Sequence, residues 1–566
     1  MKNILLLSLA GILIFALSCK KINEHEFDNG SKIASIKLDS EKTNNLVILG
    51  KVWGFLKYYH PSVREGKYNW DYELFRIMPS ILNSKTINDR NDILLKWVYS
   101  LGYTITEPSE KIDSSQVKMF PDLDWINDVS QLGMKLSGEL NRVKNAKRND
   151  RNYYFGHWEG SHLSEVKNEN SYYQFHYPDC GFHLLSLFRY WNIIQYYYPY
   201  KYLITENWNT ILPQYIPIFI NASNELEYKL AFLSLKTHIH DSHGYLLSYD
   251  NSLNNYFGNL SPKINVSFIE NKVVVTETED NSTTLNKGDV LLKINEKDIN
   301  EKKNELLTFT AASNLPAQLL RVSSNILSTN DSIINITYQR NDIIKNINIH
   351  CYPRKLGNPT KRPRNNDTCF KYLSPSIFYI NPGNIKSQYI NDTLYSQIKN
   401  TKGIIIDLRY YPTDGIIHLL LHYLYPDTIS FAKATSANLI SPGLFQFEDN
   451  ITGGNKNPDY YKGKVVIIVN EKTQSHGEFS AMAYRTTPKA TVIGSTTAGA
   501  DGNVVNFYLP GGILTLITGI GIYYPDGRET QRVGIVPDIE VHPTIKGIRE
   551  GRDELLEKAI EIINKD

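Results

Sequence analysis

The feature that most constrains this chain is a long repeat within its first half. Residues 52–79 (VWGFLKYYHPSVREGKYNWDYELFRIMP) align without a gap with residues 190–217 (YWNIIQYYYPYKYLITENWNTILPQYIP). In each copy an apolar helix is predicted to end before a proline, and a second helix to begin near an Asn-Trp pair. We expect a duplicated helix-loop-helix unit whose shared residues belong to the core. The shared positions are Trp53/Trp191, Tyr58/Tyr196, Tyr59/Tyr197, Pro61/Pro199, Asn69/Asn207, Trp70/Trp208, Leu74/Leu212 and Pro79/Pro217.

The N-terminus has the pattern of a signal peptide over residues 1–18. Lys2 precedes a 14-residue apolar run, Ile4 to Leu17, which is too short to cross about 30 Å of hydrocarbon as a helix. The small residues directly before Cys19 resemble the lipobox of bacterial lipoproteins, in which the cysteine becomes the lipidated first residue. We therefore expect an extracytoplasmic lipoprotein, anchored by lipid at Cys19 on the periplasmic or outer-membrane side. A plain secretory signal is the alternative.

Composition narrows the set of partners. The 566 residues include 61 Lys and Arg against 59 Asp and Glu, and this near-neutral balance excludes a face-wide basic surface for nucleic acid. No cofactor is predicted. After Cys19 three cysteines remain, which excludes a disulfide-built scaffold; a Cys351–Cys369 bridge and the oligomeric state stay open.

The middle of the chain, residues 258–352, is predicted to be a β-rich module. Residues 264–280 alternate and are rich in β-branched side chains, and KGDVLLKINEKDI (287–299) reads as a turn and a strand. A helical pattern and a final hairpin follow. The order resembles a PDZ domain, with Gly288 in the turn. PDZ domains bind extended peptide ends by strand addition, so the resemblance implies polypeptide ligands.

The C-terminal part, residues 370–566, is predicted to be a layered α/β domain. The buried strands KGIIIDLR (402–409) and KVVIIVN (464–470) flank the helical segment HLLLHYLY. Ser475 follows the second strand at a turn that opens a helix, where helix amides would face a developing oxyanion. The whole chain is thus a multidomain α/β protein, with a signal peptide (1–18), an anchored linker (19–45), a helical region (46–257), a PDZ-like module (258–352), a linker (353–369) and the α/β core.

Several motifs of the second half occur in a characteristic order. They are KGIIIDLRYYP, N-x-x-x-x-S-x-G-E-x-x-A, TVIGSTTAG, YYPDGRETQRVGIVPDIEVHP and GRDELLEKAI. Over about 230–566 the chain resembles the C-terminal-processing and tricorn-type serine peptidase family, which also carries a PDZ module before its core. The resemblance implies that Ser475 is the nucleophile of a peptidase acting on polypeptides through an acyl-enzyme. One branch places a lysine where this chain has Ala500. The tricorn-like branch uses an upstream histidine, matched here by His243, which follows Ser242.

The resemblance also implies the rest of the machinery. A serine hydroxyl needs a base, and a carboxylate should orient the imidazole. The family places that carboxylate before VGIVPD, where Glu529 is the acid and Gln531 an aligned neighbour; Glu478 is a rival orienter or a helix cap. The family's D-L-R-G-N-P-G-G segment lacks both terminal glycines here, so the expected oxyanion donors are the amides of His476 and of Thr413 or Asp414.

Two other classes of function stay open. His238, His240 and His243 approximate the H-x-H-x-D-H zinc pattern of metallo-β-lactamase-like hydrolases, with aspartate and serine transposed. The altered glycines would also suit a catalytically inactive lipoprotein that binds peptides.

Overall fold

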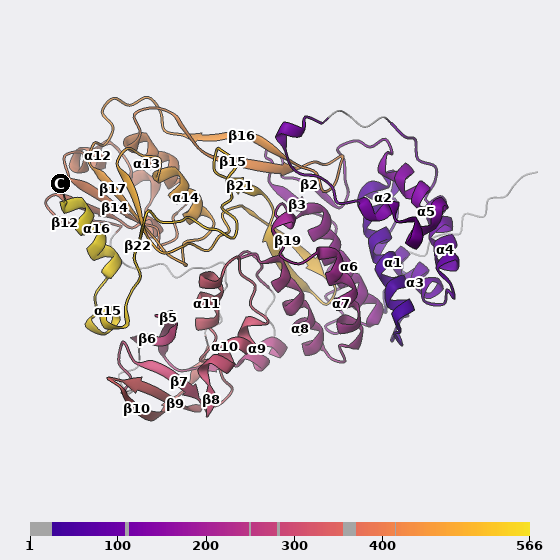
Figure 1. Ribbon diagram of the computed structural model, residues 1–566, viewed down its shortest axis with the longest axis horizontal. Coiled ribbons are helices and arrows are strands. Elements are labelled where there is room, and N and C mark those ends of the chain that lie inside the picture. The colour runs from indigo at the N-terminus through magenta and orange to yellow at the C-terminus, as the bar shows by residue number, and fades with distance from the viewer. Residues whose placement is uncertain are drawn as a thin grey trace, which may run out of the picture.

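The computed structural model describes residues 25–107, 112–247, 251–279, 284–354, 369–413 and 415–565. The predicted signal peptide, Cys19, Asp414 and most of the linker 353–369 lie outside the described residues. Figure 1 shows a helical region at one end, an α/β domain at the other and a β-rich module beside them. No helix in the described ranges is both long and apolar enough to cross a membrane. Cys180, Cys351 and Cys369 are free thiols.

The N-terminal region is mainly helical, with three short strands. Its helices are α1 (Ser40–Tyr59), α2 (Pro61–Arg64), α3 (Trp70–Leu82), α4 (Ile87–Ser100), α5 (Val129–Lys144), α6 (Cys180–Tyr197), α7 (Trp208–Asn221), α8 (Glu225–Leu235) and α9 (Asn251–Phe257). Its strands are β1 (Val117–Met119), β2 (Phe155–His157) and β3 (Ser164–Val166). A 3₁₀ turn, η4 (Lys236–Ile239), follows α8 and leads into the histidine segment, residues 237–247.

The two repeat copies share one geometry. In the first, the indole nitrogen of Trp53 donates to the carbonyl of Trp70 at 3.0 Å, and that of Trp70 donates to the carbonyl of Trp53 at 3.0 Å. In the second, Trp191 and Trp208 exchange the same two bonds at 3.0 and 3.1 Å. All four indoles are buried. These reciprocal bonds join α1 to α3 and α6 to α7, so the shared tryptophans are core residues, as predicted.

The middle module is a sheet closed by a strand pair at its base. The sheet has the order β10-β9-β7-β6-β5, with β8 paired to β7, and β4 pairs with β11 where the chain enters and leaves. Helix α11 packs beside the edge strand β5. The bounds are β4 (Leu260–Ser261), β5 (Ile264–Ile269), β6 (Lys272–Thr278), β7 (Val290–Ile294), β8 (Lys297–Asp298), α10 (Ile299–Leu307), α11 (Leu315–Ser323), β9 (Ile333–Arg340), β10 (Ile343–His350) and β11 (Tyr352–Pro353).

The C-terminal domain is built on a mixed sheet of order β12-β13-β14-β17-β18-β22, parallel from β13 onward. Alternate residues of β14 face opposite layers: Ile404 and Ile406 pack with α12, α13 and α14, whereas Ile405 packs with α16. The bounds are β12 (Phe370–Ser374), β13 (Ile377–Ile380), α12 (Asp392–Ile398), β14 (Gly403–Asp407), α13 (Ile416–Leu424), β17 (Lys464–Val469), α14 (His476–Tyr484), β18 (Ala490–Gly494), β22 (Ile539–Glu540), α15 (Ile545–Glu550) and α16 (Glu554–Asn564).

The helical region and the C-terminal domain share one core. Strand β1 of the helical region pairs with β16 (Phe445–Gly453), in a sheet completed by β15 (Ile429–Ala437) and β21 (Gly521–Tyr523). The hairpin of β19 (Val504–Leu509) and β20 (Ile513–Thr518) contributes Phe507 and Ile517 to the hydrophobic cluster that holds Trp53. The hydrophobic core therefore extends across the boundary that the sequence places between the helical region and the C-terminal domain.

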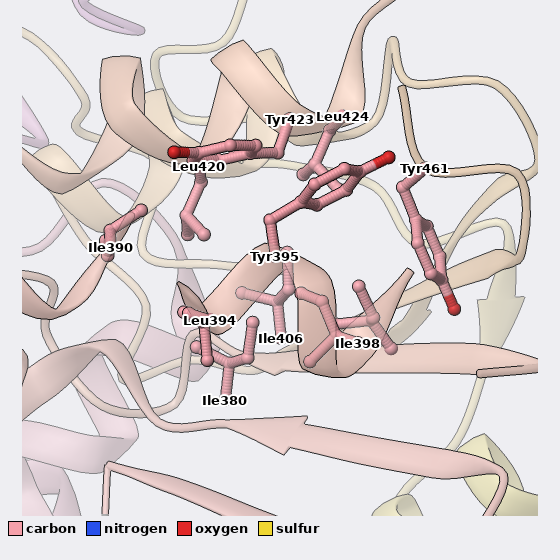
Figure 2. A pocket seen from close by; sticks show the side chains of 11 residues that line it. Ile380, Ile390, Leu394, Tyr395, Ile398, Ile406, Leu420, Tyr423, Leu424 and Tyr461 are labelled. Carbon is pink, nitrogen blue, oxygen red and sulfur yellow. The ribbon is translucent and has the colours of Figure 1, made fainter. Parts of the chain in front are cut away.

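A small apolar cavity lies between α12, α13 and the sheet (Figure 2). None of the predicted site residues lines it, and apolar cavities of this kind stay dry. It is a void within the core of the domain. The lining residues are Ile380, Ile390, Leu394, Tyr395, Ile398, Ile404, Ile406, Leu420, Tyr423, Leu424 and Tyr461.

Candidate active site

Ser475 lies in the turn between β17 and α14, at the carboxyl end of a parallel strand. Its backbone has φ 56° and ψ −124°, a conformation that costs a non-glycine residue about 1–3 kcal/mol. Its amide donates to the carbonyl of Ala500 at 2.8 Å and to Glu478 at 3.1 Å. The half-buried serine is thus fixed at the N-terminal end of α14, where helix amides can stabilise negative charge.

Glu478 holds this turn against the loop 497–500. Its buried carboxylate accepts hydrogen bonds from the amides of Ser475, Gly499 (2.7 Å) and Ala500 (2.9 Å), and from the Thr497 hydroxyl. Burial raises the pKa of Glu478 to about 7, although these hydrogen bonds oppose the rise. The sequence left two roles open for Glu478, an orienting acid or a helix cap, and these contacts match the helix cap.

The histidine segment is anchored along β20. Leu246 pairs with Thr515, and the amide of Leu247 donates to the carbonyl of Leu514 at 2.8 Å. The Thr515 hydroxyl donates to the carbonyl of Tyr245 at 3.0 Å. Although this segment precedes the middle module in sequence, β20 fixes it against the C-terminal domain.

The histidine and serine segments meet through their neighbouring residues. The side-chain amide of Gln474 donates to the carbonyl of Ser242 at 3.1 Å. The Ser242 hydroxyl donates to the carbonyl of Ala498 at 2.8 Å, in the same loop that Glu478 holds. The fold therefore brings the segments that hold Ser475 and His243 into contact, although they are far apart in sequence.

The imidazole of His243 is almost fully buried and contacts a hydroxyl. Its Nδ1 lies 2.9 Å from the Thr518 Oγ1, and that hydroxyl donates to Asp241 Oδ1 at 2.8 Å. Asp241 Oδ1 is itself 4.0 Å from the imidazole Nδ1. Sequence reasoning missed Asp241 and Thr518. The available signal was the aspartate two residues before His243.

The predicted orienting segment contributes two different groups. Glu529 accepts hydrogen bonds from Lys118 Nζ at 2.5 Å and from the Tyr202 hydroxyl at 2.8 Å, both from the helical region. The buried Gln531 donates to Asp241 Oδ1 at 3.4 Å. Gln531, which is uncharged, therefore contacts the residues around His243, while Glu529 forms an ion pair with Lys118.

One expected oxyanion donor is already engaged. The Thr413 amide donates at 3.1 Å to the carbonyl of Pro382, the first residue of a 3₁₀ turn, so it is already engaged. Asp414 lies outside the described residues. His476 occupies the first position of α14, and its ring centroid lies 6.3 Å from that of Tyr411. Residues 407–413 thus lie beside the serine turn.

The three histidines of the zinc alternative have separate partners. His238 contacts Glu206 through Nδ1 and the Tyr215 hydroxyl through Nε2, the latter at 2.8 Å. His240 caps η4 in the left-handed conformation. Within the described ranges, no group of three or more His, Cys, Asp or Glu side chains is arranged to hold a metal ion.

Comparisons with known proteins agree with this fold. The family model described as Peptidase family S41 matches residues 385–541. The structure of mature CPAF complexed with lactacystin is 13% identical, with a TM-score of 0.54 over 68% of this chain and 99% of that chain. The crystal structure of a CPAF mutant is 12% identical, with a TM-score of 0.55 over 68% of this chain and 98% of that chain. The photosystem II D1 C-terminal processing protease is 13% identical, with a TM-score of 0.39 over 68% of this chain and 97% of that chain. A search of the curated proteins found no match.

The fold, the serine turn and the family match define a serine-type peptidase. Residues 385–541 of the C-terminal domain match the model of peptidase family S41. The family and enzyme class predicted from the ordered motifs are thereby confirmed. At their low identity, the CPAF structures support the fold alone.

Proposed function

We propose that this serine peptidase is an exported, lipid-anchored enzyme in which Ser475 is the nucleophile and His243 the base. The contact of Gln474 with Ser242 carries the proposal, because it supports a close approach of the two side chains. In the reaction, Ser475 Oγ bonds to the substrate carbonyl while its proton passes to His243 Nε2. The imidazolium then protonates the amine as the C–N bond breaks, and water hydrolyses the resulting ester.

The N-terminal α14 amides supply the oxyanion site in this proposal. A helix N-terminus carries partial positive charge and free backbone donors. The hydrogen bonds of Glu478 to the amides of Gly499 and Ala500 support the rigidity that such a site needs. We assign one donor to the His476 amide. We leave the Thr413 amide out of this assignment because it already donates to Pro382.

The substrates are polypeptides, and the middle module binds their ends. Helix α11 flanks the edge strand β5, a layout that suits strand addition of an extended peptide. The module lies between the histidine segment and the serine domain in sequence. This supports a role in delivering chain ends to Ser475.

A mixed peptide library tests this function. Pure wild-type protein should cleave library members, and Ser475→Ala should lower the rate by on the order of 10³-fold or more. Peptides with free C-termini should be cleaved faster than amidated copies if the module captures chain ends. Equal cleavage by wild type and Ser475→Ala would contradict the assignment, and cleavage by neither would favour a peptide-binding protein without catalysis.

A further inference from the structure

In the segment where the family resemblance puts an orienting carboxylate, an amide makes the contact with the residues around His243. Gln531 is buried and donates to Asp241, whereas Glu529 binds Lys118 and Tyr202. The imidazole of a serine peptidase still needs an acceptor at Nδ1 to fix its tautomer. The Thr518 hydroxyl lies within hydrogen-bond distance of that nitrogen, 2.9 Å away.

The direction of the hydrogen bonds around Thr518 follows from its neighbours. The hydroxyl donates to Asp241 Oδ1 at 2.8 Å, since an ionised carboxylate only accepts. The Thr518 oxygen is then free to accept from His243 Nδ1–H. Proton placement on Nδ1 leaves a lone pair on Nε2, which is the form a base needs to take the Ser475 proton.

Asp241 is held as an acceptor from several sides. Its Oδ2 accepts from the Thr518 amide at 2.6 Å, and its Oδ1 from the His243 amide at 2.9 Å and from Gln531 at 3.4 Å. The carboxylate is completely buried. Because β20 supplies Thr518 and also anchors the histidine segment, the acid, the hydroxyl and the imidazole are positioned by one strand.

Two cations also face this segment. Lys236 in η4 donates to the carbonyl of Gly244 at 2.7 Å, and the Arg321 guanidinium in α11 donates to that of Ser242. Burial, together with the Arg321 charge, lowers the pKa of Lys236 to about 7. Asp241 is a carboxylate close enough to offset these basic groups when the imidazolium forms.

We propose that Asp241, acting through the Thr518 hydroxyl, is the carboxylate that orients and stabilises His243. The proposal rests on the proposed roles of Ser475 and His243. Asp241 and Thr518 are positioning residues, since neither acts on the substrate. The carboxylate that serves His243 thus comes from the histidine segment itself, whereas Glu529, in the segment where family resemblance puts it, pairs with Lys118.

The test uses a fluorophosphonate as the probe, because its reaction requires activation of Ser475 but no known substrate. Ser475 Oγ bonds to phosphorus, fluoride leaves, and the proton passes to His243. The second-order rate constant of labelling is measured against pH for the full chain. Thr518→Val and Asp241→Asn remove the hydroxyl and the charge, respectively, with little change of size.

Both variants should label about 10- to 100-fold more slowly than wild type. Their pH profiles should also rise at a midpoint about one unit lower, because the imidazolium loses the carboxylate in Asp241→Asn and its hydroxyl link to that carboxylate in Thr518→Val. Thr518→Ser keeps the hydroxyl and should recover the wild-type midpoint. Thr401→Val is the matched control: this buried threonine donates to the Ile398 carbonyl, and its loss should leave the midpoint in place.

Melting temperatures separate a positioning role from a structural one, since a loss of stability alone does not move the midpoint. If Thr518→Val is too unstable, Asp241→Asn alone decides. An unchanged midpoint in the folded variants, or a shift in Glu529→Gln but not in Asp241→Asn, would overturn this inference alone. A wild type that does not label at Ser475 would contradict the proposed function and this inference together.

Discussion

The Ser475 turn depends on a buried acid with an unusual protonation equilibrium. Burial raises the pKa of Glu478 from its usual 4.5 to about 7. The folded state then binds more protons than the unfolded state between these two pH values. Stability therefore falls as the pH rises through that window, by an amount on the order of 3 kcal/mol at most.

Glu478→Gln should accordingly shrink the difference in melting temperature between pH 5 and pH 7.5. Part of the difference should remain, because burial also holds the pKa of Asp501 well above its usual value. Glu471→Gln, at a half-buried position in the same loop, is the control and should keep the wild-type difference. If the melting temperature of Glu478→Gln depended on pH as that of wild type does, Glu478 would not change its protonation state in this window.

At this scale the sequence identifies residues that sit in recognisable motifs. Ser475 and His243 have such neighbours. Thr518 does not, because its contact with His243 spans 275 residues and depends on which face of β20 meets the histidine segment. The family pattern predicted Glu529 as the orienting acid. Its ion pair with Lys118 could not be read from the sequence and is seen in the structure.

At the scale of elements, the tryptophan pairs explain why the repeat is preserved as a unit. Each indole nitrogen donates to a carbonyl of the neighbouring helix, so the loss of one ring removes a buried hydrogen bond and leaves a cavity beside it. Trp208→Phe should cost about 1–3 kcal/mol, visible as a lower urea midpoint.

Trp70→Phe should cost a similar amount, because the first copy has the same two bonds. Trp158→Phe is the control: this tryptophan is 59% exposed, and its replacement should change stability by less than about 0.5 kcal/mol. If the two buried variants were as stable as this control, the paired bonds would not be what fixes the helices.

Elements with a simple pattern were predicted well. The apolar runs of β14 and β17 fit only strands covered on both faces, and the second helix of each repeat copy begins after an Asn cap. No element was predicted for 504–518, which forms the β19–β20 hairpin. Its alternation and its Gly511-Gly512 turn were a usable signal, but its role depends on packing against the helical region.

For the whole molecule, the prediction is attachment to a membrane through lipid on Cys19. The small residues before this cysteine and the preceding apolar run motivate it. Cys19→Ala should move most of the protein into the soluble extracytoplasmic fraction, measured by fractionation and immunoblotting. Cys369→Ala, at a half-buried free thiol, should remain with the membrane. If both variants stayed with the membrane, lipid anchoring through Cys19 would be contradicted.

Domain order was readable along the chain, but assembly was not. The sequence divides into helical, β-rich and α/β parts, yet β1 joins the sheet of β16, and Phe507 packs into the helical core. Composition and periodicity report which face of an element is buried, not which partner buries it. The histidine segment is positioned only once these parts are packed together.

The most direct test of the central claim is to map the site at which a fluorophosphonate reacts. Intact mass should show one adduct per chain, and peptide mapping should place it on Ser475. His243→Ala should slow labelling by on the order of 10³-fold, and a Ser475→Ala/His243→Ala double variant should be no less reactive than Ser475→Ala, because the members of one catalytic unit are not additive. An adduct at another residue, or wild-type labelling in His243→Ala, would contradict the assignment of Ser475 and His243.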